Sequence, residues 1–319
     1  MHPPAERTTW VQIPVPAIYN FLYMAPKFFT MSNKDLILQV GGSKEMFLLS
    51  SPLIEEFPEK TFEEVVSELE EKKDEFSSVE FFGGEVTGNT KFFDLIEEAS
   101  KRGYRVEIVS DCIKFADKEF TRKAVDKGLD FVSTELHGES ELHNEYVESQ
   151  VFEKVLEGVS NLADHGVELE VGSFLTKKSL KELNKLGEKL SELGVDIWTL
   201  IGVMEDMNLP GDYEEITPDY VAVCKFIKNN KELLESFESV KLMNYPMCVA
   251  PVKRAETLSI LPRFMVDKDL GNESSFKYAN IDVCEVCEFF EDCEGFMEKR
   301  LETVGKENVR ELWKLRLED

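Results

Sequence analysis

The feature that most constrains the fold is an alternation of short apolar runs with longer amphipathic segments, which begins near residue 35. Gly103, Gly128, Gly166 and Gly194 each stand between an amphipathic segment and an apolar run, where a helix would end before a strand. The pattern predicts about six βα units with parallel strands and helical crossovers. The expected strands span residues 35–40 or 46–49, then 78–82, 105–109, 131–134, 168–175 and 197–201. Such units fit a partial barrel or an open doubly wound sheet, and both place ligands at the carboxyl ends of the strands.

The alternation stops near residue 240, where Tyr245 and Pro246 begin a loop-rich segment that closes with a helix. We therefore expect an N-terminal extension of residues 1–34, a barrel-like domain of residues 35–240 and a C-terminal extension of residues 241–319. The apolar stretch within residues 10–31 is interrupted by prolines and polar residues. Neither an export signal nor a membrane span is expected there.

Charge and cysteine usage restrict the partners and the compartment. The 37 basic and 63 acidic residues give a net charge of -26, which repels nucleic acid and anionic lipid. The excess fits either a simple role in solubility or a basic partner protein. The six cysteines are spaced unevenly, which is unlike a disulfide framework and favours a reducing cytoplasm.

Residues 83–87 read GGEVT and follow an expected strand. Gly83 and Gly84 would let the backbone approach a ligand closely, and the Glu85 carboxylate could accept hydrogen bonds from an ammonium group. A tight turn that needs glycine conformations would explain the same residues without a ligand.

Several segments resemble the radical S-adenosylmethionine (SAM) superfamily. Residues 83–87 resemble its GGEP(T) motif, which holds the amino end of SAM, with Val86 in place of proline. Residues 103–112 are similar to its GY.V.IVTNG strand, and residues 128–138 to its GLD.V.ISLHG strand. The resemblance covers about residues 60–300 and implies a partial (β/α)6 TIM-type barrel. The positions at which it implies cofactor binding are Gly83, Gly84, Glu85, Ser110 and Glu135.

The chain departs from that family at the residues that would cleave SAM. The family places a CxxxCxxC triplet after its first strand to hold a 4Fe-4S cluster with one open iron. Residues 1–111 contain no cysteine, and residues 41–51 read GGSKEMFLLSS. Glu135 replaces a small hydroxyl residue and would repel the SAM carboxylate unless it were protonated or paired. Reductive cleavage of SAM by this chain alone is therefore not expected, and these departures disfavour SAM binding.

The strongest metal signal lies in the C-terminal extension, where Cys248 precedes the spaced set Cys284, Cys287 and Cys293. A CxxC pair brings two thiolates to one metal, and two further cysteines complete a sulfur site suited to zinc or to a 4Fe-4S cluster. The four cysteines resemble the auxiliary-cluster site of twitch or SPASM-like radical SAM proteins, which favours the 4Fe-4S cluster. Zinc, or no metal, remains the alternative.

Other reactive residues give weaker signals. His137 and His143 flank an acidic segment, residues 139–145, that is expected to be a surface loop because no third metal ligand is suitably spaced. Cys112 and Cys224 are expected to be buried as small apolar residues.

These observations lead to three functional hypotheses. The first is a non-canonical radical SAM-like protein with an auxiliary 4Fe-4S cluster, acting as a pseudoenzyme, an electron-transfer module or a substrate-presenting partner. Its partner would be an active radical SAM enzyme, a redox protein or a peptide substrate. The second is an enzyme that uses SAM or another small molecule at the Gly83–Glu85 turn without its own SAM-cleaving cluster. The third is a zinc-stapled structural or interaction protein.

Overall fold

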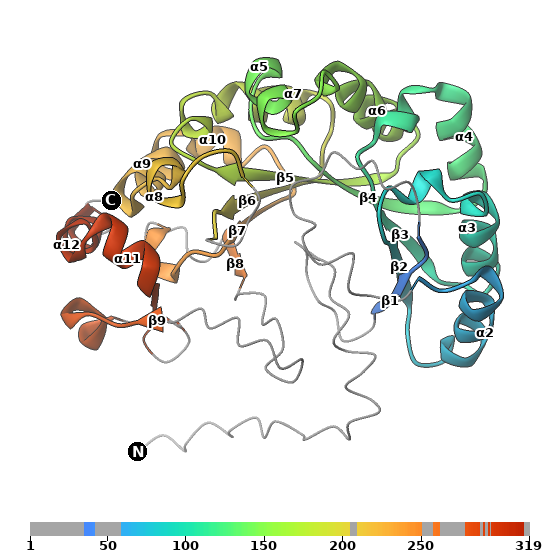
Figure 1. The fold of residues 1–319 in the computed structure, drawn as a ribbon, viewed down its shortest axis with the longest axis horizontal. Helices are drawn as coiled ribbons and strands as arrows, with labels where there is room; N and C mark the ends of the chain where they lie inside the picture. The colour runs from blue at the N-terminus through green and yellow to red at the C-terminus, as the bar shows by residue number, and fades with distance from the viewer. Residues whose placement is uncertain are drawn as a thin grey trace.

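The computed structural model describes residues 35–41, 59–204, 209–250, 258–261, 278–287, 290, 293 and 295–315. Their main feature is an eight-stranded sheet in which each strand is parallel to the next, in the order β1 to β8. The strands are β1 (Asp35–Gln39), β2 (Ser78–Phe82), β3 (Arg105–Val109), β4 (Leu129–Glu135), β5 (Glu168–Leu175), β6 (Ile197–Gly202), β7 (Ser239–Met243) and β8 (Leu258–Leu261). The sheet curves into an open arc (Figure 1), so the α/β partial barrel expected from the sequence is confirmed.

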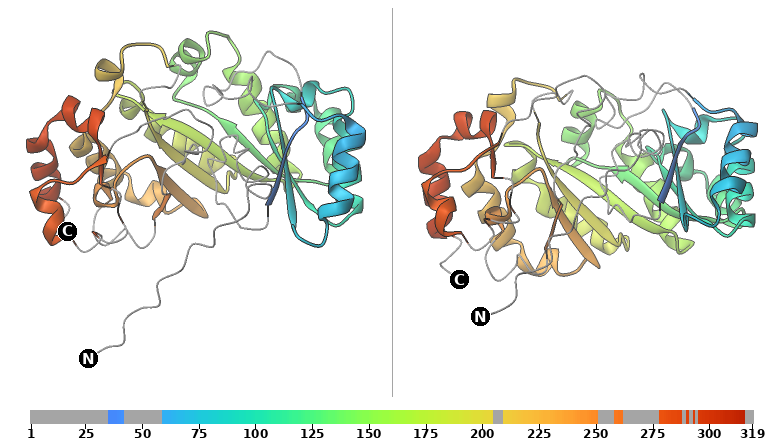
Figure 2. Two further views of the ribbon diagram at one scale, coloured as in Figure 1. Left: turned by 60° about the horizontal axis from the view of Figure 1, so that its bottom comes forward. Right: turned by 90° about the horizontal axis from the view of Figure 1, so that it is seen from below.

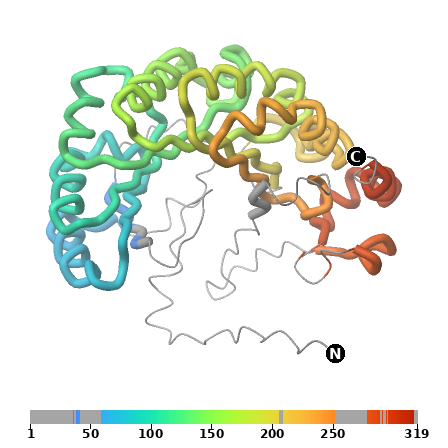
Figure 3. Tube along the Cα trace, turned by 180° about the vertical axis from the view of Figure 1, so that it is seen from behind, coloured from blue at the N-terminus to red at the C-terminus, as the bar shows by residue number. Residues whose placement is uncertain are grey.

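Helices cover the outer side of the arc (Figure 1 and Figure 3). They are α2 (Phe62–Lys72), α3 (Phe92–Lys101), α4 (Lys118–Asp126), α5 (Ser140–Tyr146), α6 (Phe152–Asp164), α7 (Leu183–Glu192), α8 (Tyr213–Ile216), α9 (Tyr220–Asn229), α10 (Lys231–Leu234), α11 (Glu298–Val304) and α12 (Lys306–Leu315). Short 3-10 helices follow several strands: η2 (Val86–Gly88), η3 (Ile113–Ala116), η4 (Ser179–Lys181), η5 (Met247–Val249) and η8 (Asp282–Val286). A capping box formed by Thr61 and Glu64 opens α2 and satisfies amide groups of its first turn.

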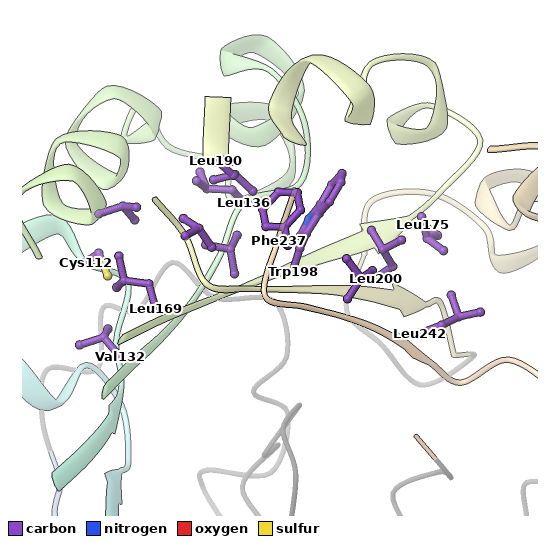
Figure 4. Packing of buried hydrophobic residues seen from close by; sticks show 14 of the residues in the cluster. Cys112, Val132, Leu136, Leu169, Leu175, Leu190, Trp198, Leu200, Phe237 and Leu242 are labelled. Carbon is purple, nitrogen blue, oxygen red and sulfur yellow. The ribbon is translucent and has the colours of Figure 1, made fainter. Parts of the chain in front are cut away.

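The apolar core lies between the sheet and the helices. Successive strand residues point to opposite faces, and Val132, Leu169, Trp198 and Leu200 point toward the helices (Figure 4). Trp198 is fully buried, and its indole Nε1 donates to Ser173 Oγ at 3.0 Å. Burying side chains of this size is the main stabilising contribution to such a fold.

The opposite face of the sheet is unusually polar for a barrel interior. Glu170 is 0% exposed and Lys241 is 2% exposed. Lys241 Nζ lies 3.1 Å from both carboxylate oxygens of Glu170. Thr199 Oγ1 on the intervening strand also donates to Glu170. This pair joins β5 to β7 inside the arc, because both residues lie on strand positions that face away from the helices.

All six strands expected from the sequence are present, and the first matches residues 35–40 rather than residues 46–49, which lie outside the described residues. The sheet also continues into β7 and β8, and the boundary expected at residue 240 falls inside β7. The expected N-terminal extension, residues 1–34, lies outside the described part of the chain.

The C-terminal segment adds a small antiparallel pair, β9 (Tyr278–Ala279) with β10 (Phe296–Met297), followed by α11 and α12. It lies at the end of the arc remote from β1 (Figure 2). Helix α12 packs against α9, and Asn308 Oδ1 accepts from the Tyr220 backbone amide at 3.0 Å. The segment is thereby fixed to the outer layer of the barrel.

Candidate functional site

The five residues expected to bind a cofactor follow or end three neighbouring strands at one edge of the sheet. Gly83, Gly84 and Glu85 follow β2, Ser110 follows β3, and Glu135 ends β4. Parallel strands bring their carboxyl ends to the same edge, which is where ligands of open and barrel-type α/β sheets bind. Of these residues, Glu85 and Ser110 are in direct contact, since Ser110 Oγ donates to Glu85 Oε1 at 2.8 Å.

The glycine turn requires glycine for two reasons. Gly83 and Gly84 have φ angles of 116° and 63°, which side-chain-bearing residues rarely adopt. A Cβ on Gly83 would lie 2.7 Å from Gln39 Cγ and 3.2 Å from the Gly41 backbone nitrogen. The turn is therefore packed tightly against the end of β1, and its glycines have a structural function whether or not a ligand binds.

The Glu85 carboxylate is already well supplied with protein donors. It is 4% exposed, and its Oε1 accepts from Thr87 N at 3.1 Å, Thr87 Oγ1 at 2.6 Å and Ser110 Oγ. Its Oε2 accepts from Asp111 N at 2.7 Å. A carboxylate offers about four acceptor positions. Glu85 thus ties the β2 turn to the β3 turn, and only Oε2 keeps capacity for a further donor such as an ammonium group.

Glu135 belongs to a buried group that includes both histidines singled out in the sequence. Glu135 Oε2 lies 3.4 Å from His137 Nε2, and the rings of His137 and His143 stack with centroids 5.6 Å apart. Both imidazoles are completely buried. Burial, and secondarily His137, lower the pKa of His143 to about 3, so its ring is neutral. Neither ring nitrogen of His143 has a hydrogen-bond partner in the described part of the protein.

The prediction of a surface loop at residues 139–145 is therefore wrong, because α5 forms there and places His143 in the interior. The signal that could have indicated it is the pair Leu142 and Tyr146, four residues apart, which marks one apolar face of a helix. Three glutamates in residues 139–145 concealed that spacing.

Glu170 and Lys241 are buried ionisable residues that the sequence did not single out. Burial raises the pKa of Glu170 to about 8, although the charge of Lys241 and the hydrogen bond from Thr199 lower it. The pair lies deeper in the barrel than the strand ends. In the sequence, this pair is visible only as a glutamate and a lysine that each interrupt an apolar strand.

The four C-terminal cysteines fall into two places. Cys248 lies on η5 after β7 and is buried, whereas Cys284, Cys287 and Cys293 are half-buried on and after η8. Burial raises the pKa of the Cys284 thiol, and the nearby Cys287 and Cys293 raise it further. Cys112 and Cys224 are both completely buried, as expected from their sequence context.

The described side chains do not form a complete metal site. Within the described residues, no three histidine, cysteine, aspartate or glutamate side chains converge in a geometry that could hold a metal ion. Cys284, Cys287 and Cys293 are neighbours, but the described side chains do not form a closed ligand set. For a SAM-cleaving cluster the sequence offers no cysteine before Cys112, so the residues present do not fit such a cluster.

Comparison with known proteins gives the family context. The model of the radical SAM superfamily matches residues 44–190. No curated protein sequence matches the chain. No helix in the described part is both long and apolar enough to cross a membrane.

Similar solved structures share the fold at low identity. They include Streptococcus suis SuiB, with 15% identity over 66% of this chain and 49% of SuiB and a TM-score of 0.50. They also include anSMEcpe with bound AdoMet and Cp18Cys peptide, with 14% identity over 89% of this chain and 96% of that chain and a TM-score of 0.59. This chain thus spans about half the length of SuiB and most of anSMEcpe. The match of residues 44–190 and the partial barrel that continues to β8 make this chain similar to the radical SAM superfamily.

Proposed function

We propose that the protein carries an auxiliary-type 4Fe-4S cluster at its C-terminal cysteines and does not cleave SAM by itself, serving an active radical SAM enzyme as a redox or substrate-presenting partner. The observation that carries the proposal is the distribution of thiols. Four of the six cysteines fall within residues 248–293, and the segment where the family places its SAM-cleaving triplet contains none. Thiolates are the ligands that such a cluster needs.

The surroundings of both sites support this division. Glu85 Oε1 accepts three hydrogen bonds from protein groups, so fewer acceptor positions of this carboxylate are left for the ammonium group of SAM. Cys284, Cys287 and Cys293 are half-buried at one end of the arc, so a cluster there would lie within reach of a docked partner. The net charge of -26 favours a partner with a basic face.

A peptide is the substrate class that the comparisons suggest. SuiB has been solved with the precursor peptide SuiA, and anSMEcpe with the Cp18Cys peptide. We infer that a peptide bound along the open side of this barrel would be presented to the partner enzyme.

The test is metal and sulfide analysis of anaerobically purified protein, with Cys287→Ser as the variant and Cys224→Ser as the matched control. We expect about four irons and four sulfides per chain and a broad visible absorption band, as a cysteine-ligated 4Fe-4S cluster requires. The band should be lost in Cys287→Ser and kept in Cys224→Ser, because Cys224 is buried in the helical layer. One zinc per chain without colour would instead support the zinc-stapled alternative.

A second candidate function is small-molecule binding at the glycine turn, favoured by the remaining capacity of Glu85 Oε2. Calorimetry with SAM and S-adenosylhomocysteine separates the two functions. Heat of binding that disappears in Glu85→Gln, while the variant unfolds at an unchanged temperature, would support the second candidate. No heat with either ligand is the result that the leading proposal expects.

A further inference from the structure

Arg300 is a completely buried cation that has no acidic partner among the described residues. It extends from α11 and is 0% exposed, and none of its three guanidinium nitrogens has a hydrogen-bond partner in the described part of the chain. Its Cζ atom lies 4.4 Å from the ring centroid of Tyr245 and 5.7 Å from that of Tyr220. Aromatic faces stabilise a guanidinium, but they leave its five N–H donors unused.

The surrounding backbone is shaped to admit this side chain. Gly202 ends β6, and a Cβ there would lie 3.1 Å from Arg300 Nη1 and 2.7 Å from Tyr245 Cε2. Asn244, which follows β7, adopts a φ of 62° and donates through Nδ2 to the Gly202 carbonyl at 3.1 Å. A side chain at Gly202 would occupy the space that the guanidinium takes, and Asn244 adopts a left-handed conformation beside it. The backbone at the ends of β6 and β7 is therefore shaped to accommodate the guanidinium.

More polar groups around Arg300 are unsatisfied. The hydroxyls of Tyr220 and Tyr245 and the Oδ1 atom of Asn244 are buried without a hydrogen bond of standard geometry among the described residues, although the Tyr245 hydroxyl lies near enough to the Arg300 guanidinium to interact with it. An unpaired buried charge costs several kcal/mol, and each unsatisfied buried hydroxyl adds roughly 1–3 kcal/mol. A bound anion would remove most of these costs, since the guanidinium and both hydroxyls can donate to it.

The charge and shape of the group define the ligand. Arg300 supplies one positive charge through a planar fork, which matches the two oxygens of a carboxylate. A phosphate dianion would leave one negative charge uncompensated. We propose that Arg300, Tyr220 and Tyr245 form a carboxylate-binding site at the carboxyl ends of β6 and β7. The carboxylate belongs to a small organic acid or to the C-terminus of a peptide.

This site lies at the same sheet edge as Glu85 but on other strands, and it needs no metal. Cys248 follows Tyr245 on η5, so the two proposals adjoin there, but their failures are distinguishable because calorimetry reports carboxylate binding and iron and sulfide analysis reports the cluster. The probes are acetate, acetamide, inorganic phosphate, and one short peptide with a free or an amidated C-terminus, measured by calorimetry on the full chain. We expect heat from acetate and none from acetamide, which has the same shape without the charge. Phosphate should bind at least about tenfold more weakly than acetate.

Two arms of the experiment distinguish the sources of the carboxylate. Binding of the free-acid peptide at least about tenfold tighter than acetate, with loss on amidation, would assign a peptide C-terminus. Equal binding of acetate and the free-acid peptide, or binding of acetate alone, would assign a small acid. Both outcomes support the site.

The variants are Arg300→Met, which removes the charge at similar length, and Tyr245→Phe, which removes only a hydroxyl. Arg300→Met should abolish acetate binding, and Tyr245→Phe should weaken it by about tenfold or more, as expected for a hydrogen bond to a charged group. Arg310→Met on α12 is the matched control, because Arg310 is exposed and paired with Asp282 and Glu307. If Arg300→Met does not fold, Tyr245→Phe alone decides. Absence of acetate and peptide binding in the wild type, or unchanged affinity in Tyr245→Phe, would overturn the site, as would tighter binding of phosphate.

Discussion

At the scale of single residues, the buried imidazole of His143 makes the protein sensitive to acid. The pKa of His143 is lowered from its ordinary value of 6.5 to about 3. Between these pH values the unfolded chain binds a proton at this residue and the folded chain does not. The contribution of His143 therefore falls as pH falls from about 6.5 to about 3, by roughly 1.4 kcal/mol per pH unit.

The measurement is urea unfolding at several pH values for the wild type and His143→Leu. Between pH 6.5 and about 4.5, the free energy of unfolding should fall by roughly 2–3 kcal/mol less in the variant than in the wild type. His165→Gln is the control, because His165 is exposed at the end of α6. Parallel pH curves for the wild type and His143→Leu would contradict the assignment.

The glycine turn gives a second prediction about single residues. Gly83→Ala should destabilise the protein more than Gly103→Ala, although both glycines have positive φ angles. Alanine at position 103 meets no atom within 4 Å and carries only the backbone strain of about 1 kcal/mol, whereas alanine at 83 also collides with Gln39 and Gly41. Thermal unfolding of the two variants measures the difference, and equal losses would show that the turn is not tightly packed against β1.

The residues of a binding site could be predicted from the sequence only where they belong to a local motif. The GGE turn was found because glycines follow an apolar strand there, and Ser110 was found because residues 103–112 resemble a motif of the radical SAM superfamily. Arg300 was not found, since its environment comes from Gly202 and Tyr245, which are far from it in sequence. A buried cation of this kind is defined by tertiary contacts and leaves no local pattern.

At the scale of elements, the ion pair between Glu170 and Lys241 joins strands that are not neighbours in the sheet. Removing either partner alone leaves a buried, uncompensated group, which typically costs about 3–5 kcal/mol. The double variant Glu170→Gln/Lys241→Met should recover a large part of that loss. A double-mutant cycle by chemical denaturation measures the coupling, and additive losses would show that the two residues do not act as a pair.

The pH dependence of Lys241→Met provides a separate test of this pair. The pKa of Glu170 is already raised to about 8 by burial, and loss of the neighbouring positive charge raises it further. A group whose pKa is raised on folding stabilises the protein below its unfolded pKa, near 4.5, and loses that contribution as pH rises through the folded value. Lys241→Met should therefore be more stable at pH 5 than at pH 8, and the reverse order would contradict a buried Glu170.

The strands show which elements can be predicted from the hydrophobic pattern of the sequence. Strands β2, β3, β5 and β6 were expected within one residue of their bounds, because each is an apolar run closed by turn residues. β7 was missed because Lys241 interrupts its apolar pattern. That charge is acceptable in the barrel only because Glu170 lies opposite it, 71 positions away in sequence. α5 was missed for a related reason, since its acidic residues concealed two apolar side chains on one face.

At the scale of the whole molecule, the protein combines a partial barrel, in which residues 44–190 match the radical SAM superfamily model, with a C-terminal segment fixed to its far end. The order of the strands brings Glu85, Ser110 and Glu135 to one edge of the sheet, and Arg300 reaches the same edge at β6 and β7. Cys284, Cys287 and Cys293 lie on the C-terminal segment at the end of the arc (Figure 2), whereas Cys248 lies on η5, which follows β7 at this edge.

The most direct test of the central claim is the release of methionine from SAM by the anaerobically purified, iron-loaded chain under a strong reductant. We expect visible absorption that bleaches on reduction, with no methionine above the level of a protein-free control, because a cluster held entirely by cysteines leaves no iron open for SAM. Methionine formed in proportion to protein, and lost in Cys287→Ser but not in Cys224→Ser, would contradict this expectation and show that the C-terminal cluster itself cleaves SAM.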